Sequence, residues 1–350
     1  YRSCGRPRRF NHSGKKVRLT GDMSDNYLTV KSAPSGAQER LYIGNAPKDA
    51  VRRSQRCRAE YIRALRDALL RETAEAKFKY YCSLCLITRD ENEYLEEWLR
   101  WHISQGVEHF YIYDHGSKQP VRKQVEGLDA EIAKKVTVID WSGNHRDAQP
   151  DAYNDCLARF RGESRWIGFI DTDEQIEVKT GQTLPQFLKG YEEYAGVFAV
   201  WVTFGACGQV KKLPGLLRER FTRPDHCCEW NDCAGKVIVQ PVYMERMVIH
   251  NGKAREGFVV ADEHGREIGE YHTTSQHPTT DYICVNHYYT KSYEEWLNKL
   301  RRGTAHAMYR RKYEEFFKVN PDMSYCRESC DILQEYENFE KTDEYKEEQK

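Results

Sequence analysis

Apolar residues between about residues 80 and 303 fall into short continuous runs that are separated by helix-spaced stripes. Short continuous runs are typical of strands that are buried on both faces of a sheet. The stripes predict helices, so strand and helix alternate and right-handed crossovers are expected. This alternation predicts an α/β fold with a mostly parallel sheet. In the first half the runs cover residues 81–88, 107–113, 136–139 and 166–170.

Local signals mark where the first helices begin and end. Asp90 and Glu93 resemble a capping box, and Gly106 follows the end of the helix that they would start. Pro150 lies just inside the start of a later helix. These signals place loops at the carboxyl ends of the predicted strands.

The pattern changes after residue 173. Further strands are expected at residues 197–204, within 237–249 and at 282–289, and residues 206–235 are loop-like. Ser292 and Glu295 form a capping box for a helix that ends before Gly303. We therefore expect a stem and long helix over residues 1–79, the main domain over 80–303, and a helical extension with a polar tail over 304–350.

Composition narrows the possible partners and compartments. The chain has 350 residues with 54 Lys+Arg and 54 Asp+Glu, so its formal net charge is zero. That balance argues against a nucleic-acid or anionic-membrane surface over the whole protein. No run approaches the roughly 20 apolar residues of a membrane span. Because the chain starts at Tyr1 and contains the sequon Asn11-His12-Ser13, we expect an excised ectodomain of a secretory protein.

Twelve cysteines favour disulfides in an oxidising compartment over a zinc site. Cys82 and Cys85 have C-x-x-C spacing, but on a strand they would point to opposite faces. Cys227, Cys228 and Cys233 cluster without a second pair downstream. The sequence leaves the disulfide pairing open.

The strongest chemical signal is Asp171-Thr172-Asp173, which follows the apolar run that ends at Ile170. Ligands of open α/β sheets bind at the carboxyl ends of strands. Two acids there repel each other unless a cation lies between them, and a hard divalent ion also binds phosphate oxygens. The tripeptide therefore predicts a metal–diphosphate site, and by itself it is also compatible with a plain turn or N-cap.

Several motifs stand in the order found in one enzyme family, and the chain resembles glycosyltransferase family 92, a galactosyltransferase-like family with the GT-A fold. The resemblance covers about residues 80 to 303. The chain departs from the commoner pattern at Arg89-Asp90 and at His115. The motifs are Arg89-Asp90-Glu91 with 94–98, 110–117, Gln149 with 152–157, 166–174, Trp201 with Phe204-Gly205, 219–221, 236–239 with Pro241 and His250, and 286–288 with Lys291-Ser292.

The resemblance implies a GT-A, Rossmann-like sheet flanked by helices, and an inverting, metal-dependent hexosyltransferase. The donor would be a UDP-sugar, with galactose favoured, and the acceptor a glycan or glycoprotein. Asp173 is expected to bind the metal directly, Asp171 to contact the metal or the ribose, and His287 to complete the ligands. An imidazole ligand favours Mn²⁺, with Mg²⁺ as the alternative.

The resemblance also assigns the nucleotide contacts and the candidates for the catalytic base. Asp114 is similar to the acid that recognises uracil in this fold, and Lys291 would reach a phosphate. Glu219, in a matched motif, is the first candidate for the base that inversion requires, and Asp232 is the second. The other expected nucleotide contacts are Thr88, Arg89, Glu91, Arg146, Gln149, Asn154 and Asp171.

The same resemblance implies the Golgi lumen, as the ectodomain of a single-pass type II membrane protein. The helix over 48–76 offers a narrow apolar stripe, so a homodimer through it is an open alternative to packing on the main domain. Two other functions also stay open. One is a catalytically inactive GT-A-fold carbohydrate-binding protein, and the other is a nucleotidyltransferase.

Overall fold

The computed structural model describes residues 23–24, 27–31, 38–42, 48–143, 145–224, 234–304 and 311–324. The chain divides into two compact units, residues 1–67 and 68–350. In the first unit, the strands β1 (Met23–Ser24), β2 (Tyr27–Lys31) and β3 (Gln38–Tyr42) form an antiparallel sheet. The predicted long helix is confirmed as α1 (Lys48–Glu75), which crosses the boundary in the sequence.

The second unit contains a ten-stranded sheet. The four strands of this sheet that come first in the sequence are parallel to one another and lie side by side in the order β7-β4-β5-β6. The predicted strands of the first half are therefore confirmed, within a few residues at their ends. Their bounds are β4 (Tyr80–Thr88), β5 (His109–Asp114), β6 (Val136–Asp140) and β7 (Ser164–Phe169).

The second half of the chain completes this sheet and adds antiparallel pairs. β10 lies antiparallel between β7 and β9, and β15 pairs parallel with β9 and antiparallel with β8. The mostly parallel, mixed α/β sheet flanked by helices confirms the expected GT-A-like fold class. The strands are β8 (Glu174–Val178), β9 (Gly196–Thr203), β10 (Gly235–Val239), β11 (Met244–Met247), β12 (Gly252–Ala254), β13 (Val260–Ala261), β14 (Glu267–Ile268) and β15 (Ile283–His287).

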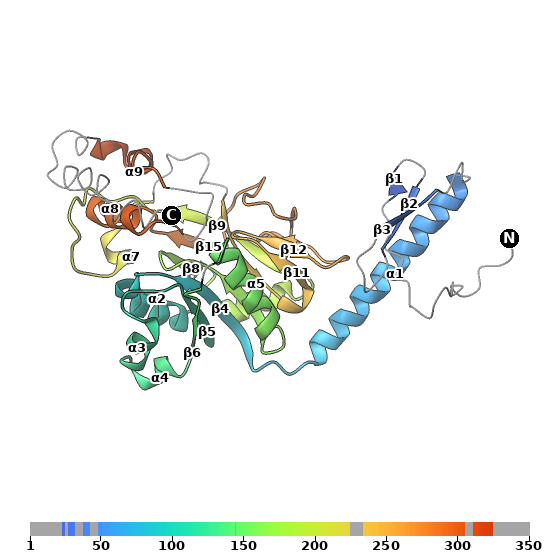
Figure 1. Cartoon of the computed structure of the whole chain (residues 1–350), viewed down its shortest axis with the longest axis horizontal. Helices are drawn as coiled ribbons and strands as arrows, with labels where there is room; N and C mark the ends of the chain where they lie inside the picture. The colour runs from blue at the N-terminus through green and yellow to red at the C-terminus, as the bar shows by residue number, and fades with distance from the viewer. Residues whose placement is uncertain are drawn as a thin grey trace. The chain divides into compact units, whose positions relative to one another are not determined.

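Helices cover both faces of the sheet, and α2, α3 and α4 group beside β4, β5 and β6 in Figure 1. The helices of this unit are α2 (Asn92–Ser104), α3 (Val121–Glu126), α4 (Ala130–Ala133), α5 (Ala148–Phe160), α6 (Leu184–Leu188), α7 (Leu217–Arg220), α8 (Tyr293–Arg302) and α9 (Glu315–Val319). Short 3₁₀ turns lie at Lys189–Tyr191, Pro241–Tyr243 and Pro321–Met323.

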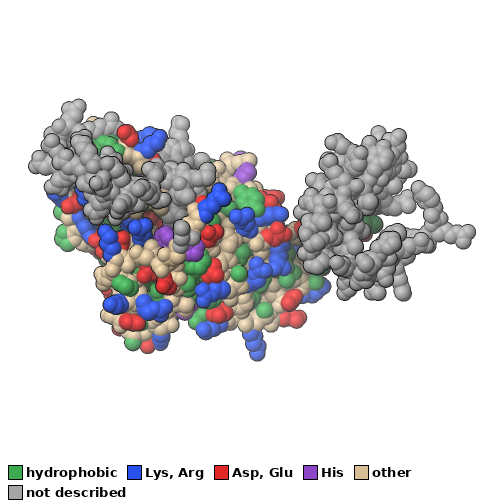
Figure 2. Space-filling model, in the orientation of Figure 1, with side chains coloured by type: hydrophobic (Ala, Val, Ile, Leu, Met, Phe, Trp, Pro, Cys, Tyr) green, Lys and Arg blue, Asp and Glu red, His purple; other side chains and the backbone are tan. Residues whose placement is uncertain are grey.

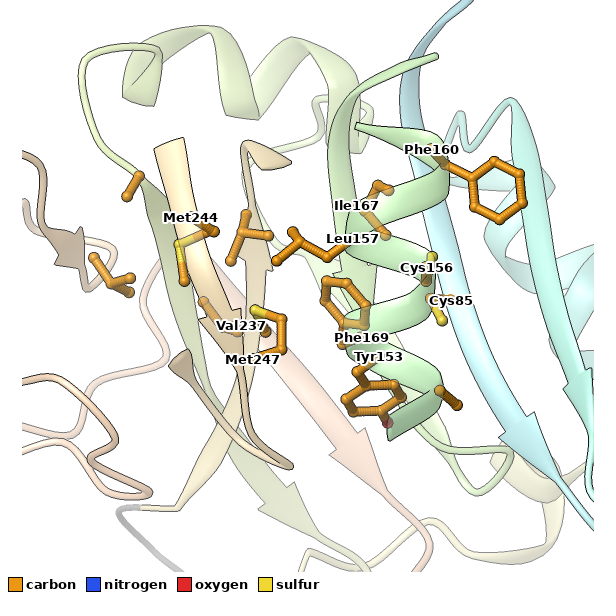
Figure 3. Close-up of a cluster of buried hydrophobic side chains, with 14 of the residues drawn as sticks. Cys85, Tyr153, Cys156, Leu157, Phe160, Ile167, Phe169, Val237, Met244 and Met247 are labelled. Carbon is orange, nitrogen blue, oxygen red and sulfur yellow. The ribbon is translucent and has the colours of Figure 1, made fainter. Parts of the chain in front are cut away.

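Two apolar clusters follow from the alternation of side chains along β4. Cys85 packs with Leu157 and other residues of α5 in one cluster, which Figure 3 shows. Its neighbour Leu84 packs with Trp98 and other residues of α2 in the second cluster. The expectation that Cys82 and Cys85 face opposite ways is confirmed, because they belong to different clusters. The sheet is thus buried on both faces, as its continuous apolar strands require.

One sequence prediction about local structure is wrong. Asp90 does not cap α2, because its φ of +52° turns the chain one residue earlier and Glu91 occupies the N-cap. The carboxylate of Asp90 instead accepts a hydrogen bond from the amide of Lys118 at 2.7 Å. The described cysteines are free, and because the other cysteines of the chain lie outside the described residues, the predicted disulfides stay a prediction; the free ones are Cys57, Cys82, Cys85, Cys156, Cys207 and Cys284.

Other predictions are confirmed or lie outside the described residues. Ser292 and Glu295 form the expected capping box of α8, and Gly303 follows it with a φ of +79°. The cluster of Cys227, Cys228 and Cys233 lies outside the described residues. None of the described helices combines the length and the apolar character that crossing a membrane requires. Acidic and basic side chains are interspersed over the described surface in Figure 2.

Candidate functional site

The Asp-x-Asp turn lies between the carboxyl end of β7 and the start of β8. Two reciprocal bonds close it, because the amide of Asp171 donates to Oε2 of Glu174 at 2.8 Å and the amide of Glu174 donates to the carbonyl of Asp171 at 3.1 Å. The indole of Trp98 in α2 also donates to the Asp171 carbonyl, at 3.1 Å. The turn is therefore held by the sheet and by α2, the helix that follows β4.

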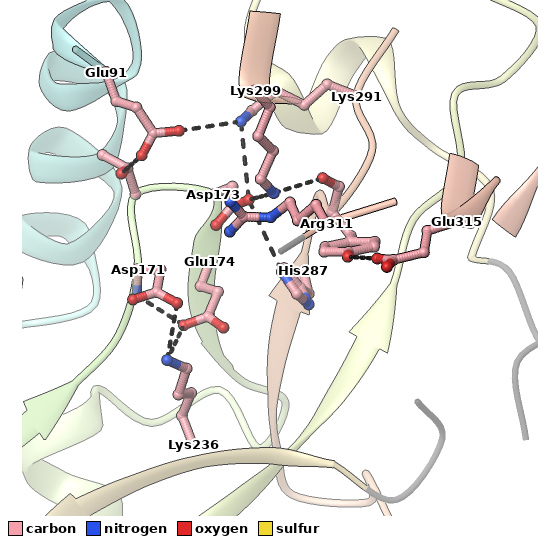
Figure 4. Close-up of polar contacts among 12 residues, drawn as sticks. Glu91, Asp171, Asp173, Glu174, Lys236, His287, Lys291, Lys299, Arg311 and Glu315 are labelled. Carbon is pink, nitrogen blue, oxygen red and sulfur yellow. Dashed lines mark hydrogen bonds and ion pairs between the residues drawn. The ribbon is translucent and has the colours of Figure 1, made fainter. Parts of the chain in front are cut away.

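The carboxylate of Asp171 is directed toward α5 and β10. Its Oδ1 accepts a hydrogen bond from Nε2 of Gln149 at 2.7 Å, and its Oδ2 lies 2.9 Å from Nζ of Lys236 (Figure 4). Burial opposes the charge of Lys236, but Asp171 outweighs it and raises the lysine pKa. Burial raises the pKa of the neighbouring Glu174 well above its usual range, although Lys236 acts in the opposite direction. Nζ of Lys236 thus lies between two carboxyl groups, 2.9 Å from Asp171 and 3.7 Å from Glu174.

Asp173 is buried and lies among three cationic or imidazole groups. Its Oδ2 is 2.5 Å from Nζ of Lys299, 3.9 Å from Nζ of Lys291 and 3.9 Å from Nε2 of His287. Burial would raise the pKa of Asp173, but Lys299, Lys291 and His287 outweigh it and hold the pKa well below its usual range. Asp173 is thus ionised within the closed site.

His287 ends β15, and the register of the sheet places it opposite Glu174 of β8. Burial lowers the pKa of His287 well below its usual range, so the imidazole is neutral. Its Nδ1 is buried and has no hydrogen-bond partner among the described residues. An ionised carboxylate and a neutral imidazole that face each other are in the protonation states that metal ligands require.

The donor set of Asp173 and His287 fits a cation such as Mn²⁺, with an oxygen and an imidazole nitrogen as ligands. The third expected ligand, Asp171, is directed to Lys236 and Gln149 instead. Among the described residues, the only group with three ligand atoms within 4.8 Å of one another is Glu263, His264 and Asp281. The structure therefore brings together two of the three expected ligands, and Lys299 contacts the same oxygen of Asp173.

A cavity of about 360 Å³ opens between the loop after β4 and helix α8. Glu91 lies in its wall, where its Oε1 is 2.6 Å from Arg302 and 3.8 Å from Lys291. Burial would raise the pKa of Glu91, but Arg302 and Lys291 outweigh it and lower the pKa. The hydroxyl of Thr172 also donates to Glu91, which joins the cavity to the Asp-x-Asp turn. The basic residues of the wall are Arg89, Lys118, Lys291, Lys299, Arg301 and Arg302.

Three other expected nucleotide contacts have different surroundings. Thr88 is buried at the end of β4, and its hydroxyl has no hydrogen-bond partner among the described residues. Asp114 organises its own loop, because its two oxygens accept from the amides of Ser117 and Val121, each at 2.9 Å. Arg146 is exposed in the turn before α5. The contact of each of these residues with a nucleotide stays a prediction.

Asn154 has a structural role that the sequence did not reveal. Its amide nitrogen donates to the carbonyls of Pro150 and Met247, at 2.7 and 2.9 Å, and its oxygen accepts from the Met247 amide at 2.9 Å. Both polar atoms of the side chain thereby fasten α5 to β11. The hydrogen-bonding groups that we expected to contact a nucleotide are used by the protein itself.

One of the two candidates for the catalytic base, Glu219, lies within the described residues. Glu219 is exposed on α7, and its Oε2 accepts from the amide of Leu216 at 3.3 Å. The helix is fixed in place because Glu97 accepts from the amide of Leu217 at 2.9 Å, and Arg220 pairs with Glu295 of α8. Asp232, like Asp225 and Glu229, lies outside the described residues.

Sequence reasoning missed Lys299 and Arg302 as parts of this site. Their spacing of three places them on one face of α8, which faces the cavity. Both were hidden among the charges of a polar helix, where Lys and Arg are usually solvated. The signal that could have found them is their position about two and three helical turns after Lys291, which was itself predicted to bind phosphate.

Comparison with known proteins agrees with these features. The profile of glycosyltransferase family 92 matches residues 79–320. A family 92 protein of Ricinus communis is 34% identical over 232 residues, which are 63% of this chain and 38% of the relative. The galactan beta-1,4-galactosyltransferase GALS1 of Arabidopsis thaliana is 34% identical over 120 residues, 31% of this chain and 23% of the relative. GALS3 of the same plant is 28% identical over 130 residues, 34% of this chain and 25% of the relative.

The chain thus spans between 23% and 38% of the length of these relatives. The matched segment contains the Asp-x-Asp turn, His287, Lys291 and the basic cavity. The family profile covers most of the second unit and ends within its last described segment. The chain therefore belongs to glycosyltransferase family 92.

Proposed function

We propose that this chain transfers galactose from UDP-galactose to a glycan or glycoprotein acceptor, with inversion and with the help of a divalent cation. The observation that carries the proposal is the pairing of an ionised Asp173 with a neutral His287, 3.9 Å apart, beside a basic cavity of about 360 Å³. Two relatives are named as galactan beta-1,4-galactosyltransferases, which favours galactose and a galactan-like acceptor.

Asp173 and His287 would hold the cation, preferably Mn²⁺, whose role is to polarise the diphosphate oxygens as a Lewis acid. The side chain of Asp171 is partly exposed, with 34% of it accessible, so that its carboxylate oxygens can accept hydrogen bonds from the ribose. Gln149 and Lys236 fix its orientation. Lys291, 3.9 Å from Asp173, supplies a further positive charge to the leaving diphosphate.

Inversion needs one carboxylate that accepts the proton of the acceptor hydroxyl while the hydroxyl oxygen attacks the anomeric carbon. Glu219 is the described candidate, because it is exposed on a helix that is anchored next to α8. The acceptor would approach from this side. The Golgi lumen is the compartment that we propose for such an enzyme.

The experiment that tests the proposal is a transfer assay with a panel of UDP-sugars and β-1,4-galacto-oligosaccharides, with Mn²⁺ or with EDTA. We expect transfer from UDP-galactose and a thermal shift by UDP-galactose that requires Mn²⁺. Thermal protection by another UDP-sugar would change the donor that we assign, but it would leave the proposed glycosyltransferase activity in place. No shift with any nucleotide sugar, together with binding of a glycan, would overturn the proposal in favour of a carbohydrate-binding protein.

A further inference from the structure

At the basic cavity, ion pairs join two cationic residues of α8 to carboxylates of other segments of the chain. Lys299 donates to Asp173 at 2.5 Å, and Arg302 donates to Glu91 at 2.6 Å. Lys291 lies between the two pairs, 3.8 Å from Glu91 and 3.9 Å from Asp173 (Figure 4). Three cations therefore face two carboxylates, and this part of the site has one positive charge in excess.

The helix that carries these cations is held rigidly. At its start, Ser292 accepts from the amide of Glu295, and the carboxylate of Glu295 accepts hydrogen bonds from both terminal nitrogens of Arg220. Tyr94 of α2 donates to the same carboxylate at 2.7 Å. All these groups are buried. Lys299 and Arg302 are consequently presented to the cavity from a fixed frame, which lowers the entropy cost of gripping a ligand.

These cations have more N–H donors than the hydrogen bonds described above use. An ammonium has three N–H donors and a guanidinium five. Lys299 uses two of its donors on Asp173 and on the carbonyl of Tyr289, and the side chains of Lys299 and Arg302 are 5% and 18% accessible. Together with Lys291 and Arg89, they form a wall whose chemistry suits several anionic oxygens close together. Adjacent phosphates of a nucleotide have this arrangement, and they match the fork of an arginine.

We propose that Lys299 and Arg302 bind the diphosphate of the nucleotide donor, and that Asp173 and Glu91 hold these two cations in place before the donor arrives. The inference rests on the proposed function for the identity of the ligand and goes beyond it by naming the residues of α8 that select a diphosphate. Contact with the diphosphate draws Lys299 away from Oδ2 of Asp173, which frees that oxygen on the side of His287. Diphosphate binding and cation binding are thereby coupled through one lysine.

The test is calorimetric titration of the full chain with UDP, UMP and uridine, with Mn²⁺ and with EDTA. Lys299→Met and Arg302→Met are each expected to weaken UDP binding at least about tenfold, because each removes a charge-assisted hydrogen bond. The affinity for UMP should change by less than about threefold, so that the preference for UDP over UMP falls. Arg100→Met is the matched control, since Arg100 pairs with Glu96 on the exposed side of α2, away from the cavity.

Folding of each variant is followed by thermal melting, and Lys299→Arg and Arg302→Lys keep the charge if a Met variant does not fold. These conservative variants should retain more UDP affinity than the Met variants. UDP binding that all the variants keep would overturn this inference and leave the proposed function intact. Equal losses for UDP and UMP would overturn it as well. Failure of the wild type to bind UDP even with Mn²⁺ would overturn the proposed function and this inference together.

Discussion

Nζ of Lys236 in β10 lies 2.9 Å from Oδ2 of Asp171, so a buried ammonium on one strand orients the first acid of the Asp-x-Asp turn. The lysine side chain is 1% accessible, whereas that of Asp171 is 34% accessible. One partner thus belongs to the core, and the other is partly exposed. This relationship makes the position of Asp171 depend on the packing of the sheet.

Lys236→Met should lower both stability and turnover. Loss of the buried cation leaves Asp171 without its fixed partner, and we expect a cost of about 2 kcal/mol in the free energy of unfolding, below the full value for a wholly buried pair because Asp171 is partly exposed. Turnover should fall at least tenfold, since Asp171 is no longer held in one orientation. Urea unfolding and steady-state transfer rates measure the two effects. Turnover close to that of the wild type would contradict the orienting role.

Asp173→Asn should abolish transfer and also destabilise the protein, because Lys299 would be left buried without an ionised partner. The expected loss is about 3 kcal/mol. Adding Lys299→Met to this variant should restore much of the stability but none of the activity. Thermal melts of the single and double variants, with transfer assays at a temperature where both are folded, separate the two effects. A single variant with normal stability would show that the buried pair matters little.

Asn154→Ala should destabilise the protein without changing donor affinity. The substitution removes the three hydrogen bonds to Pro150 and Met247, at a cost of about 2 kcal/mol in the free energy of unfolding. The KM for the donor should stay within about twofold of the wild-type value in the folded protein. A tenfold rise in the KM for the donor would instead support the contact between Asn154 and the nucleotide that the sequence suggested. Arg146→Ala is the comparison, because Arg146 is exposed and its removal should leave stability unchanged.

The buried pair of Arg220 and Glu295 should make stability depend on pH in the acidic range. Burial would raise the pKa of Glu295, but hydrogen bonds from Arg220, Ser292 and Tyr94 outweigh it and lower the pKa to about 2. A depressed pKa in the folded state stabilises the protein above the unfolded pKa of about 4.3, and the effect is lost as the pH falls toward about 2. The contribution is about 3 kcal/mol at neutral pH.

Glu295→Gln tests this dependence by urea unfolding between pH 7 and pH 3. The variant should be less stable than the wild type at pH 7, and the difference should shrink as the pH falls below about 4. A difference that stays constant across the range would show that Glu295 is not held ionised by its partners. Arg100→Met, which breaks an exposed pair on α2, should change stability by less than about 1 kcal/mol at each pH.

The fold and the centre of the site could be predicted because buried parallel strands have continuous apolar sequences with polar residues at their carboxyl ends. Asp171 and Asp173 stand out after such a run, and the expected partner His287 ends another. The structure places His287 3.9 Å from Asp173, although the two residues are far apart in the sequence. Those features depend on local pattern and on the general layout of an α/β sheet.

The missed features depend on tertiary packing. The sequence of β8, Glu-Gln-Ile-Glu-Val, is short and largely polar, so that it did not predict a strand; pairing with β15 and hydrogen bonds with α2 stabilise it. Lys299 is indistinguishable in sequence from a solvated lysine until α8 packs against the loop after β4. The structural roles of Asn154 and Asp90 were not visible in the sequence for a related reason, since their hydrogen-bond partners are distant residues, Met247 and Lys118.

The antiparallel register of β8 with β15 has a consequence for how enzymes of this kind diversify. It sets His287 opposite Glu174, the residue after Asp173, and a slip by one residue would turn His287 to the other face of the sheet. The long excursion from Val178 to Ile283, which includes α7 and Glu219, begins and ends on this paired frame. Within this stretch, the loop between β9 and β10 carries α7 and Glu219, so insertions or deletions there would change the proposed acceptor side without shifting the register of β8 and β15.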